Sequence, residues 1–192
     1  MVNYNIWLET APKQLNSGLT IIKKIKNDYI ILLGGNNING RKRYEMLGGR
    51  FETFDKTALH TGIREFIEEL FNIKINLNKL DKLIEQLITN DHIIHLLTIK
   101  TTTSISYFAN FTTLKLIYNF IFNDNNKIIN SFNFTKFIEN RNSNTNKINC
   151  LQENGLYEID FISVVYLSKV HLLPLRNFSI SFLKKLKQLL TM

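Results

Sequence analysis

The segment from Thr57 to Leu70 constrains the fold more than any other part of the chain, because its apolar residues recur at the spacing of an α-helix. These residues are Ala58, Leu59, Ile63, Phe66, Ile67 and Leu70. They share one side of a helix that has about 3.6 residues per turn, and charged residues take most of the other positions. Asp55 or Thr57 can cap the start of this helix, and Asn72 can adopt a left-handed conformation at its end. The pattern predicts an amphipathic helix with one buried face.

Several other segments have the patterns of strands or helices. Apolar, β-branched runs at 19–25 and 29–33, separated by a turn, predict a β-hairpin that two following glycines close. Further strands are expected at 44–47, 92–100, 104–112 and 159–167, and loops at 41–43 and 139–149. Helices are expected at 77–87 and 180–190, whereas 114–122 and 128–138 are apolar segments of undecided type. The order predicts an α/β fold of the α+β sandwich type, in which helices flank a mixed, partly antiparallel sheet.

The length of 192 residues suits one domain with a hydrophobic core. We therefore expect a single domain over 1–192, and interpret the Asn- and Lys-rich residues 113–150 as an insertion within it. No run of apolar residues is long enough to span a membrane, and a lone cysteine, Cys150, excludes an internal disulfide and a cysteine-built metal cage. These features predict a soluble, cytoplasmic protein without a membrane partner, and they indicate no oligomeric state.

The net charge of +8 favours anionic partners. Much of the excess is Lys scattered among Asn and Ile, a mixture that an AT-rich genome also produces without selection for a ligand. Arg41, Lys42, Arg43 and Arg50 are candidates to meet phosphates. Aromatic candidates to stack on a base are Tyr4, Trp7, Tyr44, Phe51 and Tyr107.

Three glutamates of the predicted helix, Glu65, Glu68 and Glu69, are three or four residues apart and crowd one face. Like charges at these spacings repel by a few tenths of a kcal/mol, roughly, per pair. Arg64 can compensate part of this charge, and a hard cation such as Mg²⁺ can compensate the rest through carboxylate oxygens. A solvated acidic surface is the alternative interpretation of the three glutamates.

A glycine pair, Gly48-Gly49, precedes this helix and favours the metal interpretation. Glycines at the end of a strand let the backbone approach another group closely. Backbone N–H groups that bind anions would then lie beside carboxylates that bind a cation. This combination suits a metal-bridged diphosphate.

The stretch from Gly48 to Ile73 resembles the Nudix box, whose pattern is G-x5-E-x7-R-E-U-x-E-E-x-G-U with U an aliphatic residue. The residues that match by type are Gly49, Arg64, Glu65, Glu68 and Glu69, with Phe66 at the apolar position. Asp55 stands where the pattern has its first Glu, and eight residues rather than seven separate it from Arg64. The end is also one residue longer, with Asn72 as the stand-in for the last glycine. Both insertions lie outside the helix core, whose internal spacing is intact.

The resemblance implies roles for individual residues and a Nudix-like mixed sheet flanked by helices. The implied catalytic residues are Glu65, Glu68, Glu69 and Arg64, of which Arg64 would orient a helix carboxylate. The implied ligands of Mg²⁺, or of Mn²⁺, are Glu65, Glu68, Glu69 and Glu52. The implied substrate-binding residues are Gly48, Gly49, Arg50 and Arg43. A general base could come from the helix or from Glu153 or Glu158, and the four histidines form no ligand pair.

The function that this resemblance implies is Mg²⁺-dependent hydrolysis of a diphosphate linkage in a nucleoside diphosphate linked to another moiety. A second possibility within the family is removal of an mRNA cap, which the positive charge and the Asn- and Lys-rich insertion would suit. A third is a catalytically weak protein that uses the same fold to bind nucleotides or RNA. The expected partners are therefore a phosphate-containing small molecule, a nucleotide or capped RNA.

Overall fold

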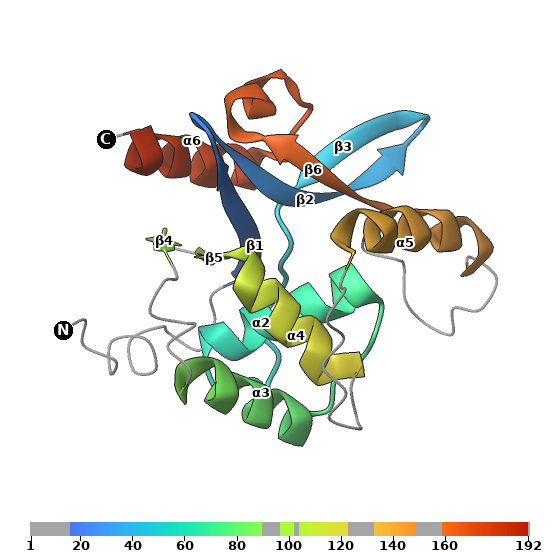
Figure 1. Ribbon diagram of the computed structural model, residues 1–192, viewed down its shortest axis with the longest axis vertical. Helices are drawn as coiled ribbons and strands as arrows, with labels where there is room; N and C mark the ends of the chain where they lie inside the picture. Colours follow the sequence, from blue (N-terminus) through green and yellow to red (C-terminus); the bar gives the residue numbers. More distant parts are fainter. Residues whose placement is uncertain (1–15, 90–96, 102–103, 123–132, 149–158, 192) are drawn as a thin grey trace.

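A computed structural model describes residues 16–89, 97–101, 104–122, 133–148 and 159–191, and in these ranges helices flank a sheet (Figure 1). The strands are β1 (Asn16–Ile25), β2 (Asp28–Ile38), β3 (Arg41–Glu45), β4 (Leu97–Lys100), β5 (Ser104–Ala109) and β6 (Phe161–Tyr166). The helices are α2 (Ala58–Phe71), α3 (Leu77–Thr89), α4 (Phe111–Phe122), α5 (Phe134–Ile148) and α6 (Asn177–Thr191), with a short 3₁₀ helix η1 (Leu167–Leu172). The six strands form one mixed sheet. The predicted α+β sandwich is confirmed.

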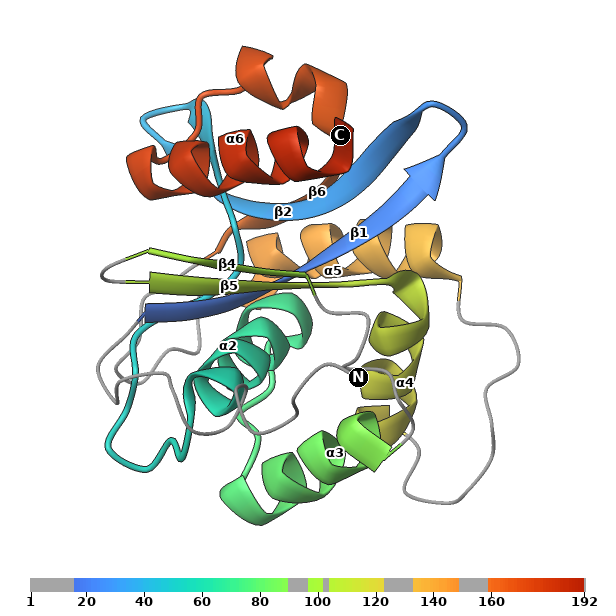
Figure 2. The same cartoon turned by 90° about the vertical axis from the view of Figure 1, so that its left-hand side faces the viewer.

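Strand β1 joins the two halves of this sheet (Figure 2). Its first part pairs in parallel with β5, from Asn16 opposite Ser104 to Ile21 opposite Ala109. Its last part turns into an antiparallel hairpin with β2. Strand β2 then pairs with β3, and β6 lies along its other edge. The first residues of β1 therefore lie beside β5 and close to the segment that follows β3.

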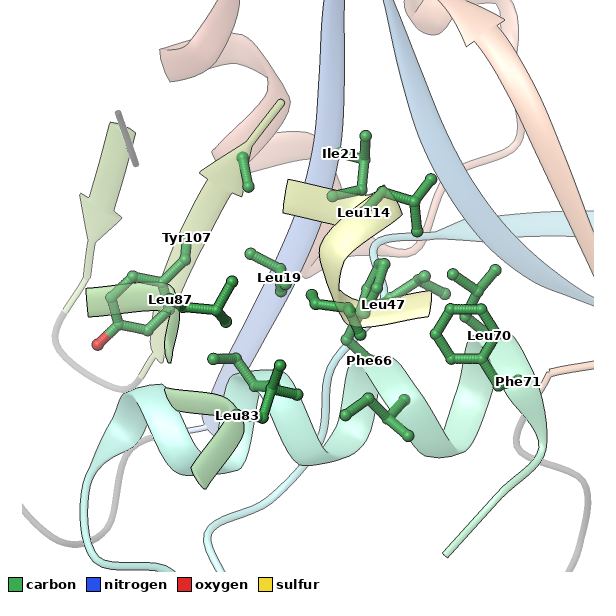
Figure 3. Packing of buried hydrophobic residues seen from close by; sticks show 14 of the residues in the cluster. Leu19, Ile21, Leu47, Phe66, Leu70, Phe71, Leu83, Leu87, Tyr107 and Leu114 are labelled. Carbon is green, nitrogen blue, oxygen red and sulfur yellow. The ribbon is translucent and has the colours of Figure 1, made fainter. Parts of the chain in front are cut away.

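Two hydrophobic cores lie on the two sides of the sheet. In the first, α2, α3 and α4 pack against β1 and β5, and Figure 3 shows several of the side chains that meet there. They include Leu19, Ile21, Phe66, Leu70, Leu83, Leu87 and Leu114. The second core lies between α6, η1 and residues of β2, β4 and β5. Each fully buried Leu or Phe contributes about 1.5–3 kcal/mol, so the apolar face of α2 holds this helix firmly on the sheet.

Helix α2 begins and ends at capping residues that the sequence predicted. Thr57 has an extended backbone and its side-chain oxygen accepts a hydrogen bond from the N–H of His60 at 3.2 Å. Asn72 ends the helix in the left-handed conformation, with φ 58°, and its N–H donates to the carbonyl of Glu68. The caps satisfy helix-end groups that would otherwise lack partners. The boundaries of the carboxylate-bearing helix are thus set by its own sequence.

The strands around the first hairpin differ from the prediction. Strand β2 continues through Gly34 and Gly35 to Ile38, and 41–43, expected as a loop, belong to β3. At both glycines a Cβ would collide with packed neighbours, which include the ring of Phe161 at Gly35. The glycines therefore allow close packing inside a strand and do not end it.

The predicted loop at 139–149 is wrong for its described part, because α5 runs from Phe134 to Ile148. The side chain of Asn142 pairs with the backbone of β6: its Nδ2 donates to the carbonyl of Ile162 at 2.9 Å, and its Oδ1 accepts from the N–H of Ile162 at 2.8 Å. Phe137 packs on Phe71 of α2, with ring centroids 5.4 Å apart. These tertiary contacts stabilise a helix whose Asn-rich composition favours a loop.

The remaining predicted elements agree with the structure in type. The helices expected at 77–87 and 180–190 are α3 and α6, and the strands expected at 104–112 and 159–167 are β5 and β6. The part of the strand expected at 92–96 lies outside the described residues. Helix α4 belongs to the first core through Leu114 and Ile117, and the interpretation of 113–150 as an insertion stays a prediction. Within the described ranges no helix is long and apolar enough to cross a membrane.

Candidate active site at the glycine loop and helix α2

The glycine loop, defined here as residues 48–57, is fixed against the first residues of β1. The N–H of Ser17 donates to the carbonyl of Gly49 at 2.9 Å, and the N–H of Gly49 donates to the carbonyl of Ser17 at 3.0 Å. Gly48 has φ 149°, and a Cβ there would lie 2.5 Å from the Cα of Gly18. The two backbone segments cross so closely that position 48 requires glycine. The loop is therefore held in one position beside α2.

Two carboxylates of α2 contact successive glycines of this loop. Glu69 accepts a hydrogen bond from the N–H of Gly48 at 2.7 Å through its Oε2. The carboxylate of Glu65 occupies the space that a side chain at position 49 would need. Glu65 and Glu69 are both buried. The loop thus lies directly against the carboxylate face of the helix, as the sequence predicted.

Arg64 connects helix α2 to the glycine loop and contacts two of the helix carboxylates. Its Nη1 lies 2.9 Å from Oε1 of Glu65 and 3.0 Å from Oε2 of Glu68. Its Nε and Nη2 donate to the two carboxylate oxygens of Asp55 at 3.0 and 2.9 Å, and Nη2 also donates to the carbonyl of Arg50 at 3.0 Å. The whole residue is only 4% exposed. Glu65 and Glu68 therefore converge on a single guanidinium nitrogen.

Asp55 and Arg64 form a buried, bidentate ion pair. Burial by itself would raise the pKa of Asp55, but hydrogen bonds from Arg64 and from the N–H of Glu52, together with the charge of Arg64 and the hydroxyl of Thr61, hold it below the ordinary value. Burial would lower the pKa of Arg64, but the hydrogen bonds that it donates to Asp55 and the charges of Glu65, Asp55 and Glu68 raise it instead. Both groups stay charged at neutral pH. The extra residue between Asp55 and Arg64 does not separate them.

The carboxylates fit a hard cation by their chemistry, but protein donors already engage them. Carboxylate oxygens are the ligands that Mg²⁺ takes in proteins, and Glu65 and Glu68 already converge on a positive group. Across the described ranges, no three His, Cys, Asp or Glu side chains are arranged to hold one metal ion. Glu52 has an exposed side chain, and its backbone N–H donates to Asp55. Metal binding would require Glu65 and Glu68 to exchange part of their contact with Arg64.

A pocket of about 340 Å³, here called the loop pocket, opens beside the glycine loop. The predicted substrate residues Gly48, Gly49 and Arg50 line it, and none of the three helix glutamates does. The N–H groups of both glycines already donate to protein acceptors, Glu69 and Ser17. Both N–H groups are therefore engaged within the protein, and their binding of phosphate stays a prediction. Two cationic side chains, Arg50 and Arg176, line the pocket.

Other residues that the sequence did not single out also line the loop pocket, among them Ser104, Ser106, Arg176 and Phe178. The two serines interrupt an apolar strand at alternate positions, which places them on one face of β5. This alternation is present in the sequence and predicts that the two serines share one face of the strand. Arg176 and Phe178 lie at the start of α6, and no pattern links them to a loop so far away in the sequence.

Other predicted residues lie elsewhere. Arg43 is exposed on β3 and lines a different hollow, so its role in substrate binding stays a prediction. Tyr107 cannot stack on a ligand base, because it is 1% exposed within the first core, where burial raises the pKa of its hydroxyl. Tyr44 packs edge-on against Phe161. The structure does not describe Tyr4, Trp7, Glu153, Glu158, His92 and His95.

His60 has a structural position, as expected. It is 7% exposed, and its two ring nitrogens lie 2.7 Å from the hydroxyl of Thr57 and 3.0 Å from Oδ1 of Asp81. These contacts join the start of α2 to α3. His171 is exposed on η1.

Comparison with known proteins identifies one similar structure. No protein-family model matches the chain, and no curated protein matches it. A solved structure described as a mutT/nudix family protein from Listeria innocua is similar over 93% of this chain and 92% of that chain, at 15% sequence identity and a TM-score of 0.41. A likeness at this level does not assign the chain to a family. The functional interpretation therefore depends on the residues of the loop and of α2.

Proposed function

We propose that the chain is a divalent-metal-dependent hydrolase of the Nudix type, which cleaves the diphosphate linkage of a nucleoside diphosphate joined to another moiety. The proposal depends on one observation, which is that the glycine loop lies against the carboxylate face of α2. The N–H of Gly48 donates a hydrogen bond to Glu69, and Gly49 packs on Glu65. A solvated acidic surface would leave these carboxylates exposed. Burial of Glu65 and Glu69 beside a glycine loop supports a built site.

In this proposal Glu65, Glu68 and Glu69 hold Mg²⁺ or Mn²⁺, with Glu52 as a further ligand. The bound metal supplies a lowered pKa for water and neutralises charge on phosphate oxygens. Glu68 is only half-buried, whereas Glu65 and Glu69 are buried. Glu68 is therefore the first candidate to accept a proton from the attacking water. Arg64 holds the carboxylates and the loop in register, and does not itself contact substrate.

The substrate would lie with its phosphates near Arg50 and its organic group in the loop pocket. Arg50 is exposed and is the cation of the glycine loop that lines this pocket. The volume of about 340 Å³ lies within the range of small-molecule sites. Gly48 and Gly49 would contribute by lining this pocket while they let β1 and Glu65 pack against the loop.

The test is release of phosphate or nucleotide with and without Mg²⁺, over nucleotide sugars, dinucleoside polyphosphates, diphosphoinositols and capped RNA. We expect metal-dependent hydrolysis of at least one class, and a loss of kcat of about a hundredfold or more in Glu68→Gln. Glu85→Gln, on the exposed face of α3, is the matched control and should keep full activity. Hydrolysis that needs no metal, or that Glu68→Gln leaves unchanged, would rule out the mechanism.

A second candidate function is a catalytically weak nucleotide- or RNA-binding protein. The contacts of Arg64 with both Glu65 and Glu68 favour it, because they already neutralise the charges that a metal would need. Calorimetric titration with Mg²⁺ and Mn²⁺ separates the two candidates. Binding of either ion that is lost in Glu65→Gln supports the enzyme, and nucleotide binding without metal binding supports the binder.

A further inference from the structure

A second, strongly basic hollow lies on the β2–β3 hairpin. This hairpin hollow has a volume of about 610 Å³, and Arg41, Lys42, Arg43, Pro174 and Leu175 line it. All three basic side chains are exposed. Three adjacent cations on one strand repel each other, so their placement around one hollow favours an anionic occupant.

The hairpin hollow and the loop pocket adjoin at one short segment. Leu175 lines the hollow and the next residue, Arg176, lines the loop pocket. This segment is held on β3, because the N–H of Tyr44 donates to the carbonyl of Pro174 and the N–H of Arg176 donates to the carbonyl of Tyr44, both at 2.9 Å. The two hollows therefore border the same segment, which the backbone of β3 holds in place.

Cations mark the surface around these two hollows. Arg41 and Arg43 lie in the hairpin hollow, Arg176 at the junction and Arg50 at the glycine loop. Arg176 pairs with the buried Glu45 at 2.8 Å while 44% of its side chain stays exposed, so the ion pair holds it in place at the surface. Among the described residues that line the two hollows none is acidic. An extended polyanion could follow this surface without meeting a like charge.

We propose that the surface binds single-stranded nucleic acid whose end enters the loop pocket. Arginine predominates along it, and the guanidinium fork matches phosphate oxygens in pairs. Phe178, which is 40% exposed, lines the loop pocket and offers an aromatic face to a base. The binding of RNA to this surface does not depend on the proposed function. Delivery of the RNA end to the hydrolytic centre does rest on the proposed function, and it narrows the substrate to an RNA whose end carries a diphosphate linkage.

The binding test uses the full chain, a short fluorescent RNA with a 5′-monophosphate, and no metal, with fluorescence anisotropy as the readout. Arg41→Gln/Arg43→Gln should weaken binding by about tenfold and reduce the slope of log Kd against log salt by about 1.4, since each lost phosphate contact removes about 0.7. The matched control, Lys184→Gln/Lys185→Gln, removes two exposed charges of α6 that line neither hollow. It should change the affinity by less than about twofold.

A contribution from base stacking is tested by Phe178→Leu, which should weaken RNA binding by about fivefold or more and leave the salt slope unchanged. The proposal is overturned if the α6 control weakens binding as much as the arginine variant, or if poly-glutamate of equal charge competes as well as RNA. A failed hydrolysis assay with intact, arginine-dependent binding therefore refutes the proposed reaction and not the binding surface.

Discussion

Arg64→Gln should destabilise the fold strongly, because it leaves the Asp55 carboxylate buried without its charged partner. Asp55 is 3% exposed, and Arg64 supplies two of its hydrogen bonds and its counter-charge. Breaking one side of a buried ion pair costs about 3–5 kcal/mol. The substitution also removes the hydrogen bonds that Arg64 donates to the carbonyl of Arg50 and to the carboxylate of Glu68, so we expect a loss of stability in the upper part of this range.

The measurement is the free energy of unfolding from urea denaturation followed by circular dichroism. Arg64→Lys keeps the charge and loses the bidentate geometry, so it should fall between wild type and Arg64→Gln. Asp55→Asn/Arg64→Gln should recover about 1–3 kcal/mol relative to Arg64→Gln, since the uncompensated charge is gone. Lys56→Gln is the control, because its ion pair with Asp81 is exposed and should contribute less than about 1 kcal/mol.

A loss of less than about 1 kcal/mol in Arg64→Gln would refute the reasoning, as would a double variant no more stable than the single one. Either result would mean that Asp55 finds other donors or is protonated in the folded chain. The link between loop and helix would then not depend on this pair.

Three other measurements follow from contacts around the site. The pKa of Asp55 is lowered by folding, so its contribution to stability is present above its unfolded value of about 3.8 and is lost as pH falls through the lower folded value. Asp28 and Asp81 also have lowered pKa values, so acid titration of the unfolding free energy should show a smaller slope in Asp55→Asn than in wild type, and an equal slope would contradict the role of Asp55. Gly49→Ala places a Cβ in the space of the Glu65 carboxylate, so it should lower the stability by about 1–3 kcal/mol in thermal unfolding and should lower the affinity for metal. Gly40→Ala is the control, because nothing lies within 4 Å of the added Cβ, and it should leave the metal affinity unchanged. Asn142→Leu removes both hydrogen bonds to the backbone of Ile162 and should cost about 1–3 kcal/mol, with faster amide exchange at Ile162; unchanged exchange would contradict the role given to Asn142.

The helix could be predicted from the sequence because its determinants are local. The apolar spacing from Ala58 to Leu70, the cap at Thr57 and the left-handed Asn72 all act within a few residues, and each is present in the structure. The position of the three glutamates on one face follows from helical geometry alone. Convergence of the loop on that face was also predicted, from the glycine pair.

The surroundings of the helix could not be predicted in the same way, because distant residues determine them. Helix α5 forms in an Asn-rich segment where Asn142 pairs with Ile162 of β6 and Phe137 packs on Phe71 of α2. Arg176 reaches the loop pocket only because its N–H pairs with Tyr44 of β3. Local propensity contains no information about such contacts.

We expect the two departures from the Nudix pattern around Asp55 to compensate each other, and Asp55→Glu tests this. Aspartate is one methylene shorter than the glutamate of the pattern, and the loop that carries it is one residue longer. Its carboxylate nevertheless reaches both Nε and Nη2 of Arg64 at normal hydrogen-bond distances, with its side chain fully buried. Glutamate should therefore overpack the site and cost about 1–3 kcal/mol, although it restores the residue type of the pattern.

Removal of Lys56 together with Asp55→Glu restores the seven-residue spacing and should recover much of the lost stability. Lys56 is exposed and its ion pair with Asp81 is a surface contact, so its own loss costs little. Deletion of Lys56 in the wild-type background should instead be destabilising, because Asp55 would then be too short to reach Arg64. Urea denaturation of the three variants measures these differences. If Asp55→Glu alone is as stable as wild type, the loop adapts to either side chain, and the added residue has no part in holding the ion pair.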